Sequence, residues 1–168
     1  MSAGPDIPVR PVADGLSETE IAAIDEALHA VPDSRAAGIE ALLAVQAERG
    51  WVSDEALEAV AAYIGRPAAE LDGAATFANL VYRQPVGRHV IMLCDSVSCY
   101  VMGADGLREA LCAHLGIRPG ETTADGRFTL LPIVCLGACD HAPTMLVDRD
   151  LIHDVTAAQF GEILERYP

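Results

Sequence analysis

Four of the five cysteines lie in two short clusters that have the residue type and number of a metal site. The first cluster is CDSVSC, with Cys94 and Cys99, and the second is CLGAC, with Cys135 and Cys139. Four thiolates are the ligand set of a two-iron or four-iron iron–sulfur cluster and also of a structural zinc ion. The chemistry of the protein therefore depends on what these four sulfurs hold.

The spacing within the two clusters favours an iron–sulfur cluster but leaves zinc open. Structural zinc sites typically use C-x2-C pairs, whereas the pairs here are C-x4-C and C-x3-C. The C-x4-C-x2-C run of plant-type ferredoxins and the C-x-x-C motif of thioredoxin-type redox sites are both absent from the sequence. A four-cysteine zinc interaction module therefore remains the alternative.

Each cysteine pair directly follows a predicted strand, over residues 89–93 and 128–134. Loops at the carboxyl ends of neighbouring strands converge in α/β sheets, so we expect both pairs to meet at one edge. The residues beside the sulfurs are small enough for backbone N–H groups to approach and stabilise a reduced cluster. They are Ser96, Ser98, Gly137 and Ala138.

The sequence before these strands predicts packed helices. A first helix begins after Ser17, which forms a capping box with Glu20. Further helices are expected from about Ser34 to Arg49, ended by Gly50, after the cap Ser53, and from Pro67 onward. The alanine-rich, aromatic-poor composition agrees with packed helices, so this part is interpreted as a small helical bundle.

The pattern changes after Thr76 to strands and helices that fit an α/β unit of thioredoxin-like size. The expected elements are strands at 79–82 and 89–93, a helix over 103–115, a strand at 128–134, a hairpin of 144–147 with 151–153, and a helix capped by Thr156. Together the two parts predict an α+β protein.

The overall charge and hydropathy exclude several classes of function. The formal net charge of −14 opposes binding to nucleic acid or to an anionic membrane surface. No apolar run is long enough to cross a bilayer, and the N-terminus lacks the pattern of a secretory signal. A reducing cytoplasm and the odd cysteine, Cys112, favour metal ligation over disulfides. Cys112 itself is interpreted as a buried small residue of a helix.

At these residues the chain resembles the E subunit of bacterial NADH-quinone oxidoreductase (complex I). This family includes the small subunits of NAD-reducing hydrogenases and NAD-dependent formate dehydrogenases. The resemblance covers nearly all of the chain beyond the N-terminal tail. The segments that carry it are RGWVSDEAL, AATF, YRQPVGRHVIMLC, CDSVSCYVMG and TTADGRFTLLPIVCLGACDHAPTMLVD. The family's usual tyrosine after ATF is Ala78 here.

The prolines and glycines of the N-terminus predict a flexible tail at 1–16. The resemblance implies a four-helix bundle at 17–78 and a thioredoxin-like domain at 79–168 that binds one [2Fe-2S] cluster. The implied ligands are Cys94, Cys99, Cys135 and Cys139. FMN and NADH are expected on the adjoining F subunit only, and no G-x-G-x-x-G or P-loop occurs in this sequence.

The resemblance also implies an electron-transfer role in an NADH:quinone oxidoreductase, without a catalytic acid, base or nucleophile of its own. It implies a position at the cytoplasmic face of the inner membrane, reached through the complex and without direct membrane insertion. The equivalent subunit of an NAD-reducing hydrogenase or a formate dehydrogenase is the alternative parent. His141, close to Cys139, is interpreted either as a residue that tunes the potential or as part of a solvated loop.

Overall fold

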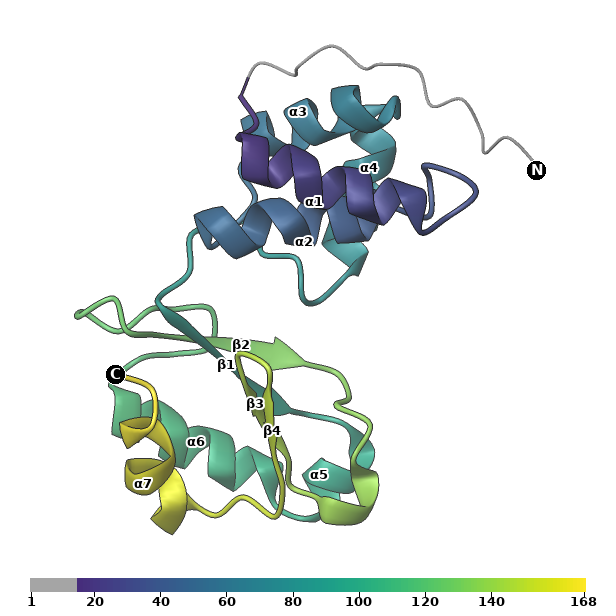
Figure 1. Ribbon diagram of the computed structural model, residues 1–168. Helices are drawn as coiled ribbons and strands as arrows, with labels where there is room; N and C mark the ends of the chain where they lie inside the picture. The colour runs from purple at the N-terminus through teal and green to yellow at the C-terminus, as the bar shows by residue number, and fades with distance from the viewer. Residues whose placement is uncertain (1–14) are drawn as a thin grey trace. The chain divides into compact units, whose positions relative to one another are not determined.

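The computed structural model describes residues 15–168, which contain helices and one four-stranded sheet (Figure 1). The chain divides at Pro85 into two compact units, and Val86–Pro168 forms the second. The predicted mixture of helices and a sheet is confirmed. The tail expected at 1–16 lies outside the described residues except for Gly15 and Leu16. No helix within 15–168 is both long enough and apolar enough to cross a membrane.

The first unit consists of helices that share one hydrophobic core. They are α1 (Glu18–His29), α2 (Gly38–Arg49), α3 (Asp54–Ile64) and α4 (Ala68–Phe77). Helix α2 contacts each of the other three. The fully buried core side chains include Ile24, Leu42, Val45 and Val60, one or two from each of α1, α2 and α3. We call this part the helical unit.

The predicted helix boundaries of this unit are largely confirmed by their capping contacts. The Glu20 amide donates to Ser17 Oγ at 3.1 Å, and the Ser17 amide donates to Glu20 Oε2 at 2.7 Å, which completes the capping box. The Ala56 amide donates to Ser53 Oγ at 3.1 Å. Gly50 ends α2 with a φ of 80°, a conformation that favours glycine.

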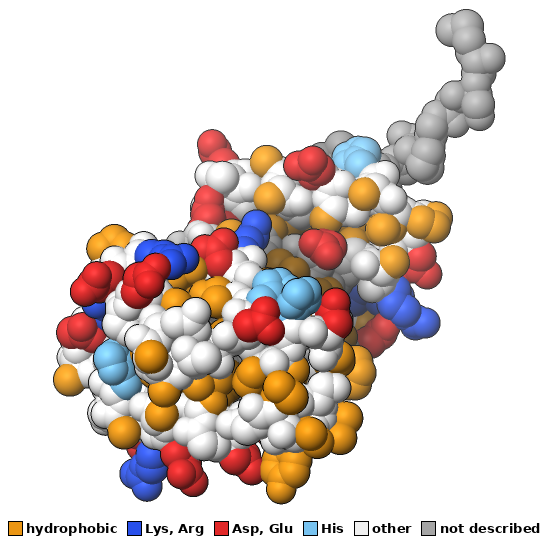
Figure 2. All heavy atoms as spheres, turned by 90° about the horizontal axis from the view of Figure 1, so that it is seen from below, with side chains coloured by type: hydrophobic (Ala, Val, Ile, Leu, Met, Phe, Trp, Pro, Cys, Tyr) orange, Lys and Arg blue, Asp and Glu red, His pale blue; other side chains and the backbone are white. Residues whose placement is uncertain are grey.

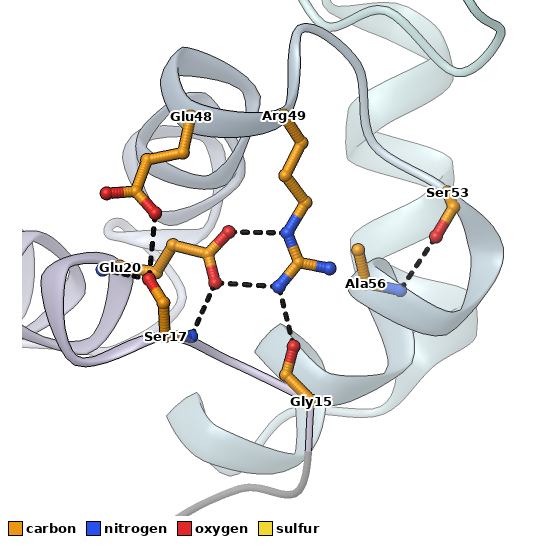
Figure 3. Close-up of polar contacts among 7 residues, drawn as sticks. All are labelled: Gly15, Ser17, Glu20, Glu48, Arg49, Ser53 and Ala56. Atoms are coloured by element: carbon orange, nitrogen blue, oxygen red, sulfur yellow. Dashed lines mark hydrogen bonds and ion pairs between the residues drawn. The ribbon is translucent and has the colours of Figure 1, made fainter.

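A buried carboxylate joins α1 to the end of α2 (Figure 3). The Glu20 side chain is 1% exposed and accepts two hydrogen bonds from Arg49, Nε to Oε1 at 2.5 Å and Nη2 to Oε2 at 2.7 Å. The same Nη2 donates to the Gly15 carbonyl at 2.6 Å. Burial alone would raise the pKa of the Glu20 carboxyl, but the bonds from Arg49 and the Ser17 amide outweigh it and lower the pKa.

Two sequence predictions in this region are wrong. Helix α2 begins at Gly38 rather than near Ser34, because a turn precedes it in which the Asp33 carboxylate accepts the Arg35 amide at 2.9 Å. The strand expected at 79–82 is absent because backbone groups of this segment form hydrogen bonds with the helical unit. The Tyr82 amide donates to Gln46 Oε1 at 2.6 Å, and the Tyr82 carbonyl accepts the Val52 amide at 2.8 Å.

The second unit is built on a sheet of strand order β2-β1-β3-β4. Its strands are β1 (His89–Cys94), β2 (Phe128–Ile133), β3 (Met145–Val147) and β4 (Asp150–Ile152). Strands β1 and β2 are parallel, whereas β1–β3 and β3–β4 are antiparallel. The predicted strands from residue 89 onward are therefore confirmed to within about one residue. We call this part the sheet unit.

Helices complete the sheet unit around its core. They are α5 (Val97–Val101), α6 (Ala104–Leu115) and α7 (Phe160–Glu165), and α6 and α7 contribute Leu111 and Phe160 to the core. Thr156 forms a capping box with Gln159 at a short 3-10 turn before α7, so the expected cap is confirmed. Helix α5 was not predicted from the sequence. Arg127 holds the end of the chain by donating to the Leu164 and Tyr167 carbonyls at 2.5 Å each.

Candidate metal centre

The two cysteine pairs follow adjacent parallel strands, as their sequence positions predict. Cys94 is the last residue of β1 and pairs in register with Ile133, the last residue of β2. Cys135 follows two residues after Ile133, so both cysteine loops leave the sheet at the same edge. Cys99 lies within α5, and Cys139 begins a short 3-10 turn, Cys139–His141.

The first pair, Cys94 and Cys99, is buried and surrounded by hydrogen-bond donors. Both side chains are at most 2% exposed, and the two thiols are in hydrogen-bond contact with each other. Backbone amides of Ser96 and Leu136 donate to the Cys94 sulfur. Thr144 Oγ1 lies 3.7 Å from Cys99 Sγ. Such donors stabilise negative charge on a thiolate.

The two thiols of this pair differ in their acidity. Burial raises the pKa of Cys94, but the amides of Ser96 and Leu136 outweigh that effect, and the net pKa lies below its ordinary value. Burial and then the neighbouring Cys94 raise the pKa of Cys99. The thiolate is the form that binds metal, and the amides beside Cys94 favour it.

The second pair, Cys135 and Cys139, is exposed to solvent. Their sulfurs lie 3.9 Å apart. The Gly137 amide donates to Cys135 Sγ at 3.4 Å. Gly137 has a φ of +82°, a conformation that glycine adopts without strain, and it points this amide at the sulfur.

A contact between the two loops joins the pairs into one site. The Leu136 amide, in the second cysteine loop, donates to the sulfur of Cys94 in the first, and Cys94 Sγ lies 3.8 Å from the Val134 carbonyl. Within residues 15–168, no three His, Cys, Asp or Glu side chains converge on one metal-ion position. The donors form two thiol pairs with amides aimed at the sulfurs, and this set fits a two-iron cluster with two thiolates on each iron.

The surface beside the first cysteine loop is apolar. Helix α5 and the residue after it expose Val97, Tyr100, Val101 and Met102, each more than 60% exposed, and Val134 in the second loop is also exposed. Figure 2 shows a face of the molecule on which exposed hydrophobic side chains lie together. Contiguous apolar surface of this kind marks sites of protein association.

Two other residues singled out in the sequence have simple environments. Cys112 is half-buried on α6 and packs against the hydrophobic core of the sheet unit. His141 is more than half exposed, and its Nδ1 lies 3.1 Å from Asp154 Oδ2. Its ring stands edge-on to the ring of His153, with the centroids 5.0 Å apart.

Comparison with known families identifies the fold and its relatives. The profile of the thioredoxin-like [2Fe-2S] ferredoxin family matches residues 24–168. The chain belongs to this family. The match covers the helical unit from Ile24 onward as well as the sheet unit, and it includes both cysteine pairs.

Curated relatives of this [2Fe-2S] ferredoxin include components of a respiratory oxidoreductase. The chain is 51% identical over 152 residues to the E subunit of NADH-quinone oxidoreductase from Escherichia coli (strain K12), covering 90% of this chain and 92% of the relative. It is 49% identical to the E subunit of NADH-quinone oxidoreductase from Pseudomonas aeruginosa, again over 90% of this chain and 92% of the relative.

A solved structure extends the comparison to hydrogenases. A crystal structure of an NAD+-reducing [NiFe]-hydrogenase in the air-oxidized state superposes with a TM-score of 0.63 at 28% sequence identity. The superposition covers 75% of this chain but 22% of the hydrogenase chain. The match is thus to one part of a longer polypeptide.

Sequence reasoning missed two groups that contact the sulfurs of this ferredoxin. One is Thr144, which lies outside both cysteine clusters and reaches Cys99 only through the pairing of β3 with β1. The other is the amide of Leu136, whose side chain carries no sign of its role. The small residues Ser96 and Gly137, in contrast, identified two backbone donors from the sequence.

Proposed function

We propose that this chain is the electron-transfer E subunit of an NADH:quinone oxidoreductase and that Cys94, Cys99, Cys135 and Cys139 hold one [2Fe-2S] cluster. The observation that carries the proposal is that the two thiol pairs meet at the ends of adjacent parallel strands, where Cys94 Sγ lies 3.8 Å from the Val134 carbonyl of the second cysteine loop. The family match and the identity to the NADH-quinone oxidoreductase relatives support it.

The residues of the chain have distinct roles in this proposal. Cys94 and Cys99 would hold one iron in the buried part of the site, and Cys135 and Cys139 would hold the other at the surface. A [2Fe-2S] cluster, when bound, supplies one-electron redox chemistry. The amides of Ser96, Leu136 and Gly137 stabilise the sulfur charge, and no residue of this chain acts as a catalytic acid, base or nucleophile.

The partner in this proposal is the flavin-bearing F subunit, which holds FMN and NADH. The apolar surface of α5 and Val134 supports this assignment, because it adjoins the cysteine site and exposes several large hydrophobic side chains in a short stretch. We propose that the complex holds the chain at the cytoplasmic face of the inner membrane.

The domain assignment belongs to the same proposal. The four helices of the helical unit are the N-terminal bundle of an E subunit, and the sheet unit is the thioredoxin-like domain that carries the cluster. The core shared by α1 to α4 and the sheet order β2-β1-β3-β4 support this assignment.

The hydrogenase likeness favours a second candidate parent. The equivalent module of an NAD-reducing hydrogenase, or of a formate dehydrogenase, is this alternative. The 28% identity to the hydrogenase chain, against 51% to the Escherichia coli relative, favours the quinone oxidoreductase. Copurification of the tagged chain from its own host, followed by identification of the associated proteins, distinguishes the parents.

Spectroscopy of the purified chain tests the cluster. Anaerobic preparation is expected to give a coloured protein with two irons per chain and an EPR signal on reduction. Cys135→Ser should abolish or distort that signal, whereas Cys112→Ser, which lies outside both cysteine pairs, should leave it unchanged. A colourless, EPR-silent protein with stoichiometric zinc would instead establish the zinc interaction module.

A further inference from the structure

Thr144 is a buried polar residue whose hydroxyl contacts both thiols of the first pair. It is 1% exposed, and its Oγ1 lies 3.7 Å from Cys99 Sγ. The same hydroxyl also lowers the pKa of the neighbouring Cys94 thiol, as a hydrogen-bond donor does. Because buried hydroxyl groups require a partner, and the partners of this one are sulfur atoms, Thr144 has a specific relation to the cysteine site.

The sheet fixes the position of this hydroxyl. Thr144 directly precedes β3, and its carbonyl accepts the Cys94 amide at 3.1 Å, one residue beyond the register pair of Leu93 and Met145. The Thr144 amide also donates to the Cys99 sulfur. Two backbone contacts therefore hold Thr144 against the cysteines, so its hydroxyl is preorganised toward the sulfurs.

We propose that Thr144 is a positioning residue whose hydroxyl donates a hydrogen bond to the sulfurs of the first cysteine pair and thereby raises the reduction potential of the cluster. This inference rests on the proposed function, because it requires these thiolates to be cluster ligands. Reduction adds one electron to a chain with a formal charge of −14. A donor at the sulfur stabilises the more negative, reduced state more than the oxidised state.

A second buried threonine provides a matched control. Thr129 on β2 is 2% exposed, and its Oγ1 accepts the Gly87 amide at 2.6 Å and lies 2.7 Å from Thr122 Oγ1. Its register partner is Val90, four residues before Cys94 on the same strand. Replacing Thr129 therefore removes a buried hydroxyl of the same unit that bonds to no cysteine.

The experiment compares Thr144→Val, Thr144→Ser and Thr129→Val in the full chain, loaded with cluster anaerobically. Valine keeps the shape of threonine but replaces the hydroxyl with a methyl group. Redox titration followed by EPR should show that Thr144→Val lowers the equilibrium constant for reduction about tenfold, which is about 59 mV for a one-electron couple. Thr144→Ser should remain near wild type, whereas Thr129→Val should lower the melting temperature without moving the potential.

Several results would overturn the inference. They are an unchanged potential in Thr144→Val, an equal change in Thr144→Ser, or an equal change in Thr129→Val. If Thr144→Val assembles no cluster, Thr144→Ala replaces it in the comparison. A reduction potential of Thr144→Ala equal to that of Thr144→Ser would then refute the role of the hydroxyl. A wild-type chain that binds no iron refutes the proposed function and this inference together, whereas an unshifted potential in a loaded variant refutes the inference alone.

Discussion

Arg49→Ala should destabilise the helical unit more than Glu20→Gln, although each substitution removes the same ion pair. The Glu20 side chain is 1% exposed and that of Arg49 is 36% exposed, so water can solvate the guanidinium but not the carboxylate. Glu20→Gln loses charge-assisted hydrogen bonds, at a cost of about 1–2 kcal/mol. Arg49→Ala leaves a buried carboxylate without its counter-charge, at a cost of about 3–5 kcal/mol.

The stabilities of the two variants should also depend differently on pH. In the wild type the pKa of Glu20 is lowered, so its stabilisation is present above the unfolded pKa of about 4.3 and is lost as pH falls through the folded value. In Arg49→Ala the bonds and the charge of Arg49 are lost, and we expect burial, the largest single effect on Glu20, to raise its pKa above the unfolded value. The free energy of unfolding that Arg49→Ala loses relative to the wild type should therefore become smaller as pH falls from 7. The loss caused by Glu20→Gln should stay constant until about pH 4.

Trp51 makes the measurement specific, because it is the one tryptophan of the sequence and belongs to the helical unit. Urea unfolding of the full chain, followed by Trp51 fluorescence at several pH values, gives the free energy of unfolding of this unit. The reasoning is refuted if Arg49→Ala costs no more than Glu20→Gln at pH 7, or if its deficit widens in acid.

Three further predictions concern the sheet unit. Gly137→Ala forces alanine into a φ of +82° beside a cysteine of the site, at a cost of about 1–2 kcal/mol, and should lower the iron content of the purified protein. The control Gly161→Ala, whose added methyl group on α7 meets open space, should leave the iron content unchanged. Burial, with a hydrogen-bonded carboxylate, raises the pKa of Tyr167 to about 12, so the wild type should lose stability relative to Tyr167→Phe between about pH 10 and 12 in thermal melts. Val97→Asp on α5 should reduce copurification with the flavin-bearing partner while leaving the EPR spectrum intact, and Leu151→Asp, exposed on β4, should leave both unchanged.

The sequence predicts this structure best where a local contact sets it. The Ser17 capping box and the cap at Ser53 depend on neighbouring residues, so their patterns could be interpreted without knowledge of the fold. The segment at 79–82 has strand-forming residues, but Val81 enters the core of the helical unit and Tyr82 pairs with Gln46. The Gln46 partner lies 36 residues away in the sequence, where no local propensity reveals it.

The cysteine site shows the same division. The two strands before the cysteines and the small Gly137 were recognisable from residue type and spacing. Helix α5 was not recognisable in the sequence, because Val97–Val101 is a helix of five residues that contains β-branched valines and is too short to show a helical pattern of apolar residues. Thr144 contacts Cys99 across 45 residues of sequence, through strand pairing that only the folded sheet provides.

The sheet order has a consequence for the protein as it leaves the ribosome. Strand β1, which ends in Cys94, lies between β2 and β3, and β3 begins at Met145. Synthesis at about 5–20 residues per second therefore leaves the first cysteine loop without its β3 neighbour for several seconds. During that time Cys94 and Cys99 belong to an unfolded segment of the nascent chain, and only a reducing environment prevents them from forming disulfides before translation is complete.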